Sequence, residues 1–473
     1  MTDSQSGNHA SASAAPYRAG YVWAISLVAA LGGLLFGYDW VVISGADIFY
    51  EKFFKLATSA EVGWAKSCAL VGCLLGAVLS GMLSDRFGRK RLLILSAFLF
   101  TVSSFGTGLA NTYTAFVLWR IIGGAAIGLA SNLSPMYIAE VAPAQVRGKL
   151  VSINQLTIVV GILLAQVVNW LIAQPVPPDA TAQEILNSWN GQTGWRWMFA
   201  ATAAPSLLFL LGMFFVPESP RWLAKNGQRD RALNVLARIG GAVGAQKAIS
   251  EIEATLANEI ERVQFRHLLD PKLRKVLFFG IVLAVLQQWC GINVIFYYTK
   301  DVFAAAGYKV SDILLNIVIV GLANLTFTFV AIQTVERLGR RFLMLAGWAG
   351  LTVIYLLLGG SYFFKLQGAT LVVLVVAAIG CYACTLAPMT WVVLSEIFPN
   401  RIRGAAMSIA VFALWTGCFT LTYTFPILNA RLGSAGTFWL YAVICAAGFV
   451  FCQARLPETK GKTLEQIERE LVD

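Results

Sequence analysis

Long, nearly uninterrupted apolar stretches recur along this chain and constrain its fold more than any other feature. A mostly apolar stretch of about 18 or more residues can cross a bilayer as a helix. The chain is 58% hydrophobic and 13% charged, whereas a soluble domain is about 25% charged. The sequence therefore predicts an all-α membrane protein and argues against a large soluble α/β enzyme. Twelve apolar segments are expected, at about residues 21–46, 64–84, 92–110, 114–139, 150–173, 195–215, 273–306, 312–335, 342–364, 369–397, 404–428 and 434–455.

Lys and Arg are concentrated in alternate loops, which gives the predicted orientation. The intervening loop ANTYT has no charge. Basic loops stay on the cytoplasmic side, so both termini and the central polar stretch are expected in the cytoplasm, in an inner or plasma membrane. The net charge of +11 then indicates topology rather than nucleic-acid binding. The basic loop residues are Arg86, Arg89, Lys90 and Arg91, then Arg147 and Lys149, then Arg337, Arg340 and Arg341, and finally Arg401 and Arg403.

The two halves of the chain repeat each other in their polar loops. EVAPAQVRGKLVS matches EIFPNRIRGAAMS, DRFGRKR matches ERLGRRF, and PESPR echoes PETKG. Two six-helix units of the same orientation predict a secondary transporter with its substrate site between the halves, near the midplane. The polar stretch between them has helical spacing and is too short for a core of its own. The expected parts are a disordered tail (1–20), a six-helix bundle (21–216), a cytoplasmic helical linker (217–272), a second bundle (273–456) and a C-terminal tail (457–473).

The repeated loop charges suggest a gate on the cytoplasmic side. A network that forms only when this side is closed would stabilise the outward-open state. The alternative is that the basic residues only fix topology and meet lipid headgroups. The network is expected to include Asp85, Arg86, Arg89, Glu140, Arg147, Arg340, Glu396 and Arg403.

A few amides and one indole lie inside the apolar segments, where polar side chains usually serve function. A sugar needs groups that both donate and accept hydrogen bonds and an aromatic ring to stack on. An amide can also simply bond neighbouring helices. The amides of the seventh segment would converge on one ligand if its helix breaks at Gly291. The candidate substrate residues are Gln155, Gln287, Gln288, Asn293, Asn324 and Trp391.

Asp39 is a lone carboxylate in the apolar stretch LGGLLFGYDWVVISGA. A charge at the bilayer centre costs roughly 2.5–3.5 kcal/mol, so Asp39 needs a partner, a proton or water. Arg120 is the only basic residue inside the fourth segment and is its natural partner. A carboxylate beside an arginine stays charged, and one facing an apolar cavity takes up a proton. Movement between these environments would couple transport to protons; the alternative is a static pair that joins two helices.

Nothing in the sequence indicates catalysis or a cofactor. The eight Cys lie in apolar runs and are expected to be small membrane-helix residues rather than disulfides or metal ligands. No carboxylate pair, nucleophile–base set or phosphate-binding loop is evident. The chain is therefore expected to be no enzyme and to need no metal.

Six motifs in chain order resemble those of the sugar porter family of the major facilitator superfamily. They are GMLSDRFGRKR, the R-x-G-G of WRIIGG, PESPR, QQWCGINVIFYY, ERLGRR and PETKG. The resemblance implies that the six candidate residues match sugar-contacting positions, that Tyr297 and Tyr298 match an extracellular gate, and that an acid at Asp39 accompanies proton symport. This chain departs from the family at Ile162, Ala387, Leu414 and Cys418, which predicts a more apolar pocket and leaves the sugar open. Thr202 stands where some proton symporters of the family carry Glu, which implies simpler or weaker proton coupling than in those relatives.

The resulting expectation is a monomeric transporter that imports a neutral monosaccharide, a pentose or a hexose, with protons by alternating access. A facilitative carrier in which Asp39 and Arg120 are purely structural is the first alternative. A sugar sensor that does not transport is the second.

Overall fold

The computed structural model describes residues 17–177, 180–258, 271–305, 307–366, 368–398 and 403–458. These residues form helices and connecting turns, with no strand among them. The predicted tails, 1–20 and 457–473, lie largely outside the described residues. The all-α membrane fold is therefore confirmed for the part of the chain that the structure describes.

The first half is built around five long helices and a sixth, composite span. A short helix, α6 (Ala182–Asn187), precedes that span. The span itself, Asn190–Phe215, joins a π-helical turn η1 (Asn190–Gly194), α7 (Trp195–Ala200) and α8 (Ala203–Phe215). The long helices are α1 (Ala19–Phe53), α2 (Ser59–Phe87), α3 (Arg89–Gly108), α4 (Tyr113–Val141) and α5 (Ala144–Ile172).

Glycines let helices of this half approach closely. A Cβ on Gly37 of α1 would lie 1.8 Å from the Ile158 carbonyl oxygen of α5, and one on Gly124 of α4 would lie 1.9 Å from the Ala69 oxygen of α2. Even the methyl group of an alanine would overlap these oxygens, so at both glycines the two helix backbones are in direct contact. Small residues at helix crossings are the usual way in which membrane helices pack.

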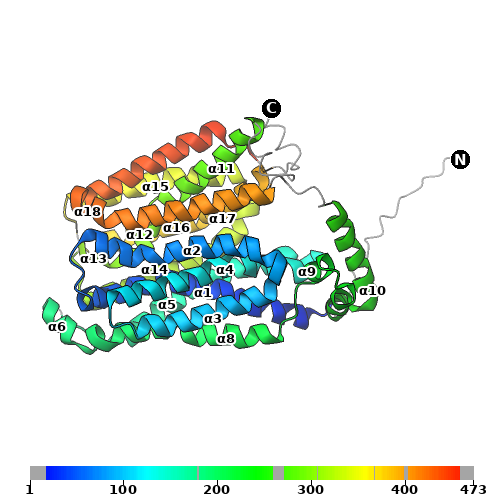
Figure 1. Cartoon of the computed structure of the whole chain (residues 1–473). Helices are drawn as coiled ribbons and strands as arrows, with labels where there is room; N and C mark the ends of the chain where they lie inside the picture. Colours follow the sequence, from blue (N-terminus) through cyan, green and yellow to red (C-terminus); the bar gives the residue numbers. More distant parts are fainter. Residues whose placement is uncertain are drawn as a thin grey trace.

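Two helices connect the halves. They are α9 (Pro220–Lys225) and α10 (Arg229–Asn258), which is broken at Gly240 and Gly241. Both lie beyond the end of the bundles at which α1 begins and α18 ends (Figure 1). The Arg18 N–H donates to the Ile239 carbonyl at 2.8 Å, so the start of α1 is attached to this linker.

The second half repeats this arrangement, but its predicted segments 273–306 and 369–397 are each divided into shorter helices. The seventh segment forms α11 (Pro271–Trp289), α12 (Ile292–Tyr297) and α13 (Thr299–Ala305). The break that would let its amides converge is present, because Gly291 has φ 87° between α11 and α12. The remaining helices are α14 (Val310–Leu338), α15 (Arg340–Phe363), α16 (Ala369–Cys384), α17 (Leu386–Ile397) and α18 (Arg403–Arg455).

Eleven helical stretches of the described residues are long and apolar enough to cross a membrane. The last, Ala406–Arg455, has 50 residues, or about 75 Å of helix at about 1.5 Å per residue, more than twice the hydrocarbon thickness. It breaks at Gly433, whose φ of 68° is not helical. This stretch therefore holds both of the last two predicted segments, and the twelve-helix prediction is confirmed.

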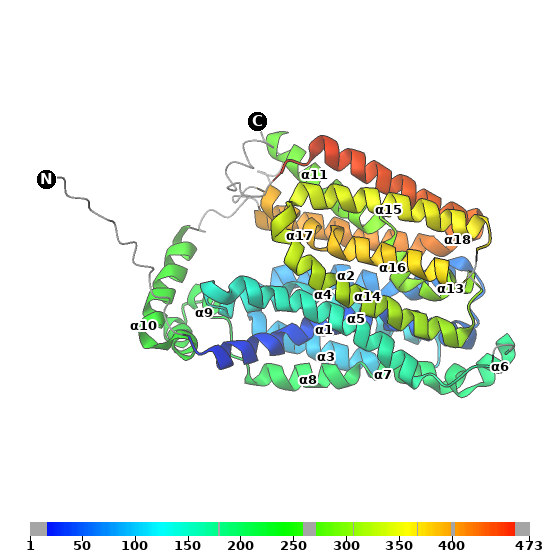
Figure 2. The ribbon, with the colours of Figure 1, turned by 180° about the vertical axis from the view of Figure 1, so that it is seen from behind.

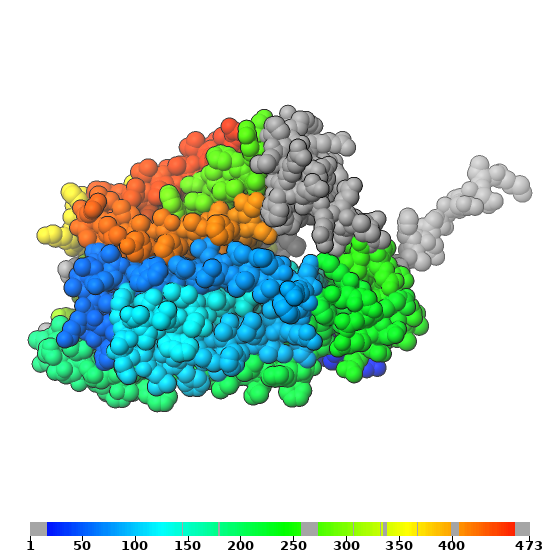
Figure 3. Space-filling model, in the orientation of Figure 1, coloured from blue at the N-terminus to red at the C-terminus, as the bar shows by residue number. Residues whose placement is uncertain are grey.

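The two halves lie against each other as two layers of roughly parallel rods (Figures 1 and 2). Across their boundary α2 packs on α18 and α5 packs on α14. The space-filling view shows α18, in orange, seated directly on α2, in blue (Figure 3). Large apolar side chains such as Phe215, Leu109 and Phe278 remain exposed on the surface of the bundles, as expected where lipid covers the surface.

Candidate functional site

Asp39 and Arg120 form a buried ion pair inside the first half. Arg120 Nη1 donates to Asp39 Oδ1 at 2.8 Å, and the two residues are only 3% and 7% exposed. The Arg120 guanidinium also lies 5.4 Å from the centre of the Phe199 ring. Asp39 Oδ2 is buried and has no hydrogen-bond partner in the described part of the chain. The structure thus brings together the pair that the sequence singled out, and leaves one carboxylate oxygen unused.

Three of the predicted substrate amides form one hydrogen-bonded chain at the break between α11 and α12. Gln288 Nε2 donates to Gln287 Oε1 at 2.7 Å, and Asn293 Nδ2 donates to Gln288 Oε1. Gln287 Nε2 in turn donates to the Tyr382 hydroxyl of α16. The left-handed backbone at Gly291 turns the chain so that α11 and α12 present these amides to one another. Tyr382 is a member that the sequence did not single out.

Aromatic rings connect the ion pair to this amide chain across the two halves. Trp40, next to Asp39, has its ring centre 5.3 Å from that of Tyr297 on α12. It also lies 5.6 Å from Trp415 of α18, whose ring is 5.9 Å from Phe36. Asn293 Nδ2 reaches the Cys418 thiol of α18 at 3.6 Å. The ion pair and the amides therefore share one boundary between the halves.

The other predicted substrate residues lie apart from this chain. Gln155 on α5 is exposed, and Trp391 on α17 is 42% exposed. Neither side chain forms a hydrogen bond within the described residues. Asn324 on α14 is buried. The structure places these three on three different helices and does not join them to the amide chain.

Gln166 is a buried amide on α5 that the sequence analysis missed. It is 1% exposed, and neither its oxygen nor its nitrogen has a partner in the described part of the chain. A Cβ on Gly321 of α14 would lie 1.8 Å from Gln166 Oε1, so the amide fills the boundary between the halves. Gln166 follows Gln155 by 11 residues, about three helical turns, and that spacing would have placed both amides on one face.

The predicted loop charges form two matching clusters, one in each half. Arg89 donates to Glu140 at 3.0 Å and to Asp85 at 3.2 Å. In the second half Arg340 donates to Glu396 at 3.3 Å. Each of these pairs stays within its own half. Arg86 and Arg147 are exposed and form no ion pair among the described residues, and the side chain of Arg403 lies outside the described part.

The PESPR and PETKG motifs have the same local role. Glu218 accepts from the backbone N–H groups of Arg89 and Lys90 at 3.0 and 3.1 Å. Glu458 accepts from those of Arg340 and Arg341, also at 3.0 and 3.1 Å. A carboxylate at a helix N-terminus satisfies free N–H groups and the helix dipole. The sequence repeat is thus a structural repeat, with one acid at the start of α3 and one at the start of α15.

Two packed helical halves, a broken helix at their boundary and a buried ion pair define a membrane transporter of the major facilitator type. A family model described as "Sugar (and other) transporter" matches residues 25–471. The chain belongs to this sugar transporter family and is an integral membrane protein rather than an enzyme.

Its relatives include proton symporters for sugars. The chain is 39% identical to the D-xylose-proton symporter of Escherichia coli, with 96% of each chain covered. It is 38% identical to the arabinose-proton symporter of Bacillus subtilis, with 95% of each covered. Among solved structures it is similar to the inward-open conformation of the xylose transporter XylE from E. coli, with a TM-score of 0.83, 37% identity, and 95% of this chain and 100% of that chain covered.

Proposed function

We propose that this chain imports a neutral monosaccharide, a pentose or a hexose, together with protons by alternating access. The observation that carries the proposal is the buried ion pair of Asp39 and Arg120, which Trp40 and Tyr297 connect to the amide chain of α11 and α12. Proton and sugar sites at one boundary between two halves are what coupled movement of those halves requires.

The amide chain supports a sugar rather than an ion as substrate. Amides donate and accept hydrogen bonds without a net charge, and Trp391 supplies an exposed ring for stacking. Cys418 is buried 3.6 Å from Asn293 Nδ2 and adds apolar surface beside the amides, and Leu414 is buried one helical turn earlier on α18. This apolar surface favours a sugar with an apolar face. The proposed substrate residues are Gln155, Gln287, Gln288, Asn293, Asn324 and Trp391, and the proposed outer gate includes Tyr297 and Tyr298.

Proton coupling follows from the chemistry of the pair. While Arg120 holds Asp39, the carboxylate is stabilised in its charged form. If a movement of α1 against α4 breaks the contact, the carboxylate is left in an apolar site and takes up a proton. We place that proton on Asp39 Oδ2, the buried oxygen that has no partner among the described residues.

We also propose an orientation and a subunit state. The end of the bundles that bears α9 and α10 carries the basic clusters around Arg89 and Arg340, so it is the cytoplasmic end, and the opposite end with α6 and α13 is the outer end. The protein is proposed to work as a monomer in an inner or plasma membrane, with both termini in the cytoplasm. The proposed cytoplasmic gate is the set Asp85, Arg86, Arg89, Glu140, Arg147, Arg340, Glu396 and Arg403.

The test is sugar-induced proton uptake by the purified protein in liposomes that contain a pH-sensitive dye. D-xylose, L-arabinose, D-glucose, D-galactose and myo-inositol are added in turn. Acidification with one of them establishes symport and identifies the substrate class. Sugar entry without a pH change would make the protein a facilitative carrier. Sugar binding without entry would indicate a sensor.

A further inference from the structure

A second group of buried charges lies at the outer end, outside the proposed proton and sugar sites. It consists of Asp47 and Glu51 of α1, Lys66 of α2, and Lys300 and Asp301 of α13. Asp47 and Lys66 have no exposed surface. The sequence analysis missed this group because its members are far apart in the chain and lie at the ends of apolar segments. We call these five residues the outer charge cluster.

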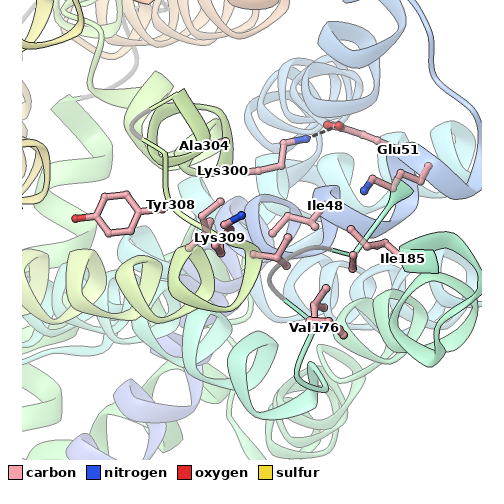
Figure 4. A pocket seen from close by; sticks show the side chains of 13 residues that line it. Ile48, Glu51, Val176, Ile185, Lys300, Ala304, Tyr308 and Lys309 are labelled. Carbon is pink, nitrogen blue, oxygen red and sulfur yellow. Dashed lines mark hydrogen bonds and ion pairs between the residues drawn. The ribbon is translucent and has the colours of Figure 1, made fainter. Parts of the chain in front are cut away.

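Three contacts of the outer charge cluster join the two halves. Lys66 Nζ lies 3.3 Å from Asp301 Oδ2, Lys300 Nζ pairs with Glu51 Oε2, and Lys300 Nζ lies 4.0 Å from Asp47 Oδ2. Figure 4 shows the Lys300 side chain reaching across to Glu51 beside a cavity of about 250 Å³. Lys66 Nζ also lies 4.0 Å from the centre of the Tyr298 ring.

Three further contacts stay within one half. Lys66 Nζ lies 2.5 Å from Asp47 Oδ2 and 3.6 Å from Glu51 Oε1 in the first half. Lys300 Nζ lies 3.9 Å from Asp301 Oδ1 in the second. If the halves separated here, each lysine would keep an acid from its own half. A buried charge left without a partner is strongly destabilising, and this arrangement avoids that penalty in both positions of the halves.

At the opposite end of the molecule, no ion pair between described residues joins the two halves. The ion pairs between described residues at that end, such as Arg89 with Glu140 and Arg340 with Glu396, each lie within one half. Of all ion pairs formed between described residues, those that join the two halves belong to the outer charge cluster. The structure therefore has charge contacts across the outer end, in agreement with its similarity to an inward-open transporter.

We propose that the outer charge cluster is an ionic gate that holds the outer end closed in the inward-facing state and divides into two self-paired groups when that end opens. Lys66 and Lys300 are its central residues, and Glu51 and Asp301 are their partners across the boundary. The gate is separate from Tyr297 and from the Asp39–Arg120 pair, although its meaning for transport depends on the proposed function.

The charge states of Lys300 and Asp301 support ion pairing across this gate at neutral pH. Burial disfavours the charge on Asp301, but Lys66 and Lys300 outweigh it and hold the pKa of Asp301 below its usual value. Burial likewise opposes the charge on Lys300, and the Asp47 and Asp301 carboxylates outweigh it and raise the pKa of Lys300.

The experiment measures closure of the outer end directly, independently of any sugar. Spin labels are attached through an azide-bearing amino acid at positions 60 and 305, which are exposed on α2 and α13, so that the native thiols are left unlabelled. Distances are compared in lipid nanodiscs for the unaltered chain, Lys300→Met, and Lys55→Met. Lys55 is an exposed lysine beside the cluster and has no ion pair in the described part of the chain.

The expected result is a shift of roughly tenfold or more toward the longer distance in Lys300→Met, with no shift in Lys55→Met. Charge reversal then separates a gate from a structural contact. Lys300→Glu should open the outer end, and adding Glu51→Lys should close it again by restoring an opposite pair. An unchanged distance distribution in Lys300→Met, or no rescue by the double reversal, would overturn the proposal even if the protein proved to carry sugar.

Discussion

Replacing Asp39 with Asn should abolish accumulation of sugar while leaving sugar exchange intact. The change keeps the shape of the side chain and an oxygen near the Arg120 Nη1 donor, now 2.8 Å from Asp39 Oδ1. It removes the charge and the oxygen on which we place the proton. One proton moving down 100 mV yields about 2.3 kcal/mol, which at about 1.4 kcal/mol per tenfold supports roughly 50-fold accumulation of a neutral sugar. Accumulation should therefore fall from roughly 50-fold to none.

The same change also has a structural effect that must be separated from coupling. Both partners are almost fully buried, so Asp39→Asn leaves Arg120 as a buried, unpaired cation. Removing one partner of a buried pair costs about 3–5 kcal/mol, whereas replacing both partners by neutral residues is often nearly neutral. The double variant Asp39→Asn with Arg120→Met should therefore recover thermal stability without recovering accumulation.

The assay uses proteoliposomes with an inside-negative potential and a pH-sensitive dye inside. Radiolabelled sugar uptake is followed against its gradient, and counterflow exchange is measured in parallel to confirm that the variants still bind and carry sugar. If Asp39→Asn still accumulates sugar several-fold and acidifies the lumen, the proposed coupling role is wrong. The pair would then be only a structural link between α1 and α4.

Four further predictions concern the amides, the helix break, the aromatic boundary and the outer gate. Gln288→Ala removes the central amide of the hydrogen-bonded chain at the α11–α12 break. With about 1–2 kcal/mol per lost hydrogen bond, sugar binding measured by calorimetry should weaken roughly tenfold. Unchanged affinity would exclude this amide from the sugar site. Gly291→Ala places a Cβ 2.8 Å from the Tyr441 ring at a φ of 87°, whereas the control Gly227→Ala meets nothing within 4 Å at a φ of 72°. Both variants suffer backbone strain of about 1–2 kcal/mol, so the larger fall in Tm expected for Gly291→Ala measures its steric clash with Tyr441. Equal falls in Tm would contradict this clash. Trp40→Ala removes ring contacts to Tyr297 and Trp415, worth about 0.5–1.5 kcal/mol each beyond buried area, and should lower the Tm followed with a thiol-reactive dye; an unchanged Tm would show that these contacts do not hold the halves together. For the outer gate, Asp301 with its lowered pKa contributes stability above its unfolded value of 3.8 that is lost as pH falls through the folded pKa. Lys300 with its raised pKa contributes stability below 10.5 that is lost as pH rises through the folded pKa. Both groups keep their charges between about pH 7 and 9, so the 60–305 distance should stay short there; opening within that window would show that one of the facing groups, Asp47, Glu51, Lys52, Lys66 or Tyr298, controls the gate instead.

Some features could be predicted because a single local rule decides them. The apolar length of each segment fixes a membrane helix, and glycine at position 291 permits the left-handed turn that breaks the seventh one. Asp39 and Arg120 could be paired from the sequence because an isolated charge in an apolar segment requires a partner and the fourth segment contains one cation. The repeat of PESPR and PETKG likewise anticipated two equivalent places, although not that Glu218 and Glu458 accept from the first N–H groups of α3 and α15.

Other features depend on how distant segments meet, and no local rule contains that information. Lys66 and Asp301 are 235 residues apart, and each alone resembles an ordinary charge at a helix end. Gln166 is one amide among several until α14 packs against it. Tyr382 joins the amides only because α16 packs against α12 and brings the Tyr382 hydroxyl to Gln287. The sequence by itself determined the helices, their number and the pairing of the one acid buried in the first apolar segment, because these follow from solvation along the chain. Only the tertiary structure decided which charges and amides face each other across the two halves, because those contacts depend on helix rotation and register set by close packing.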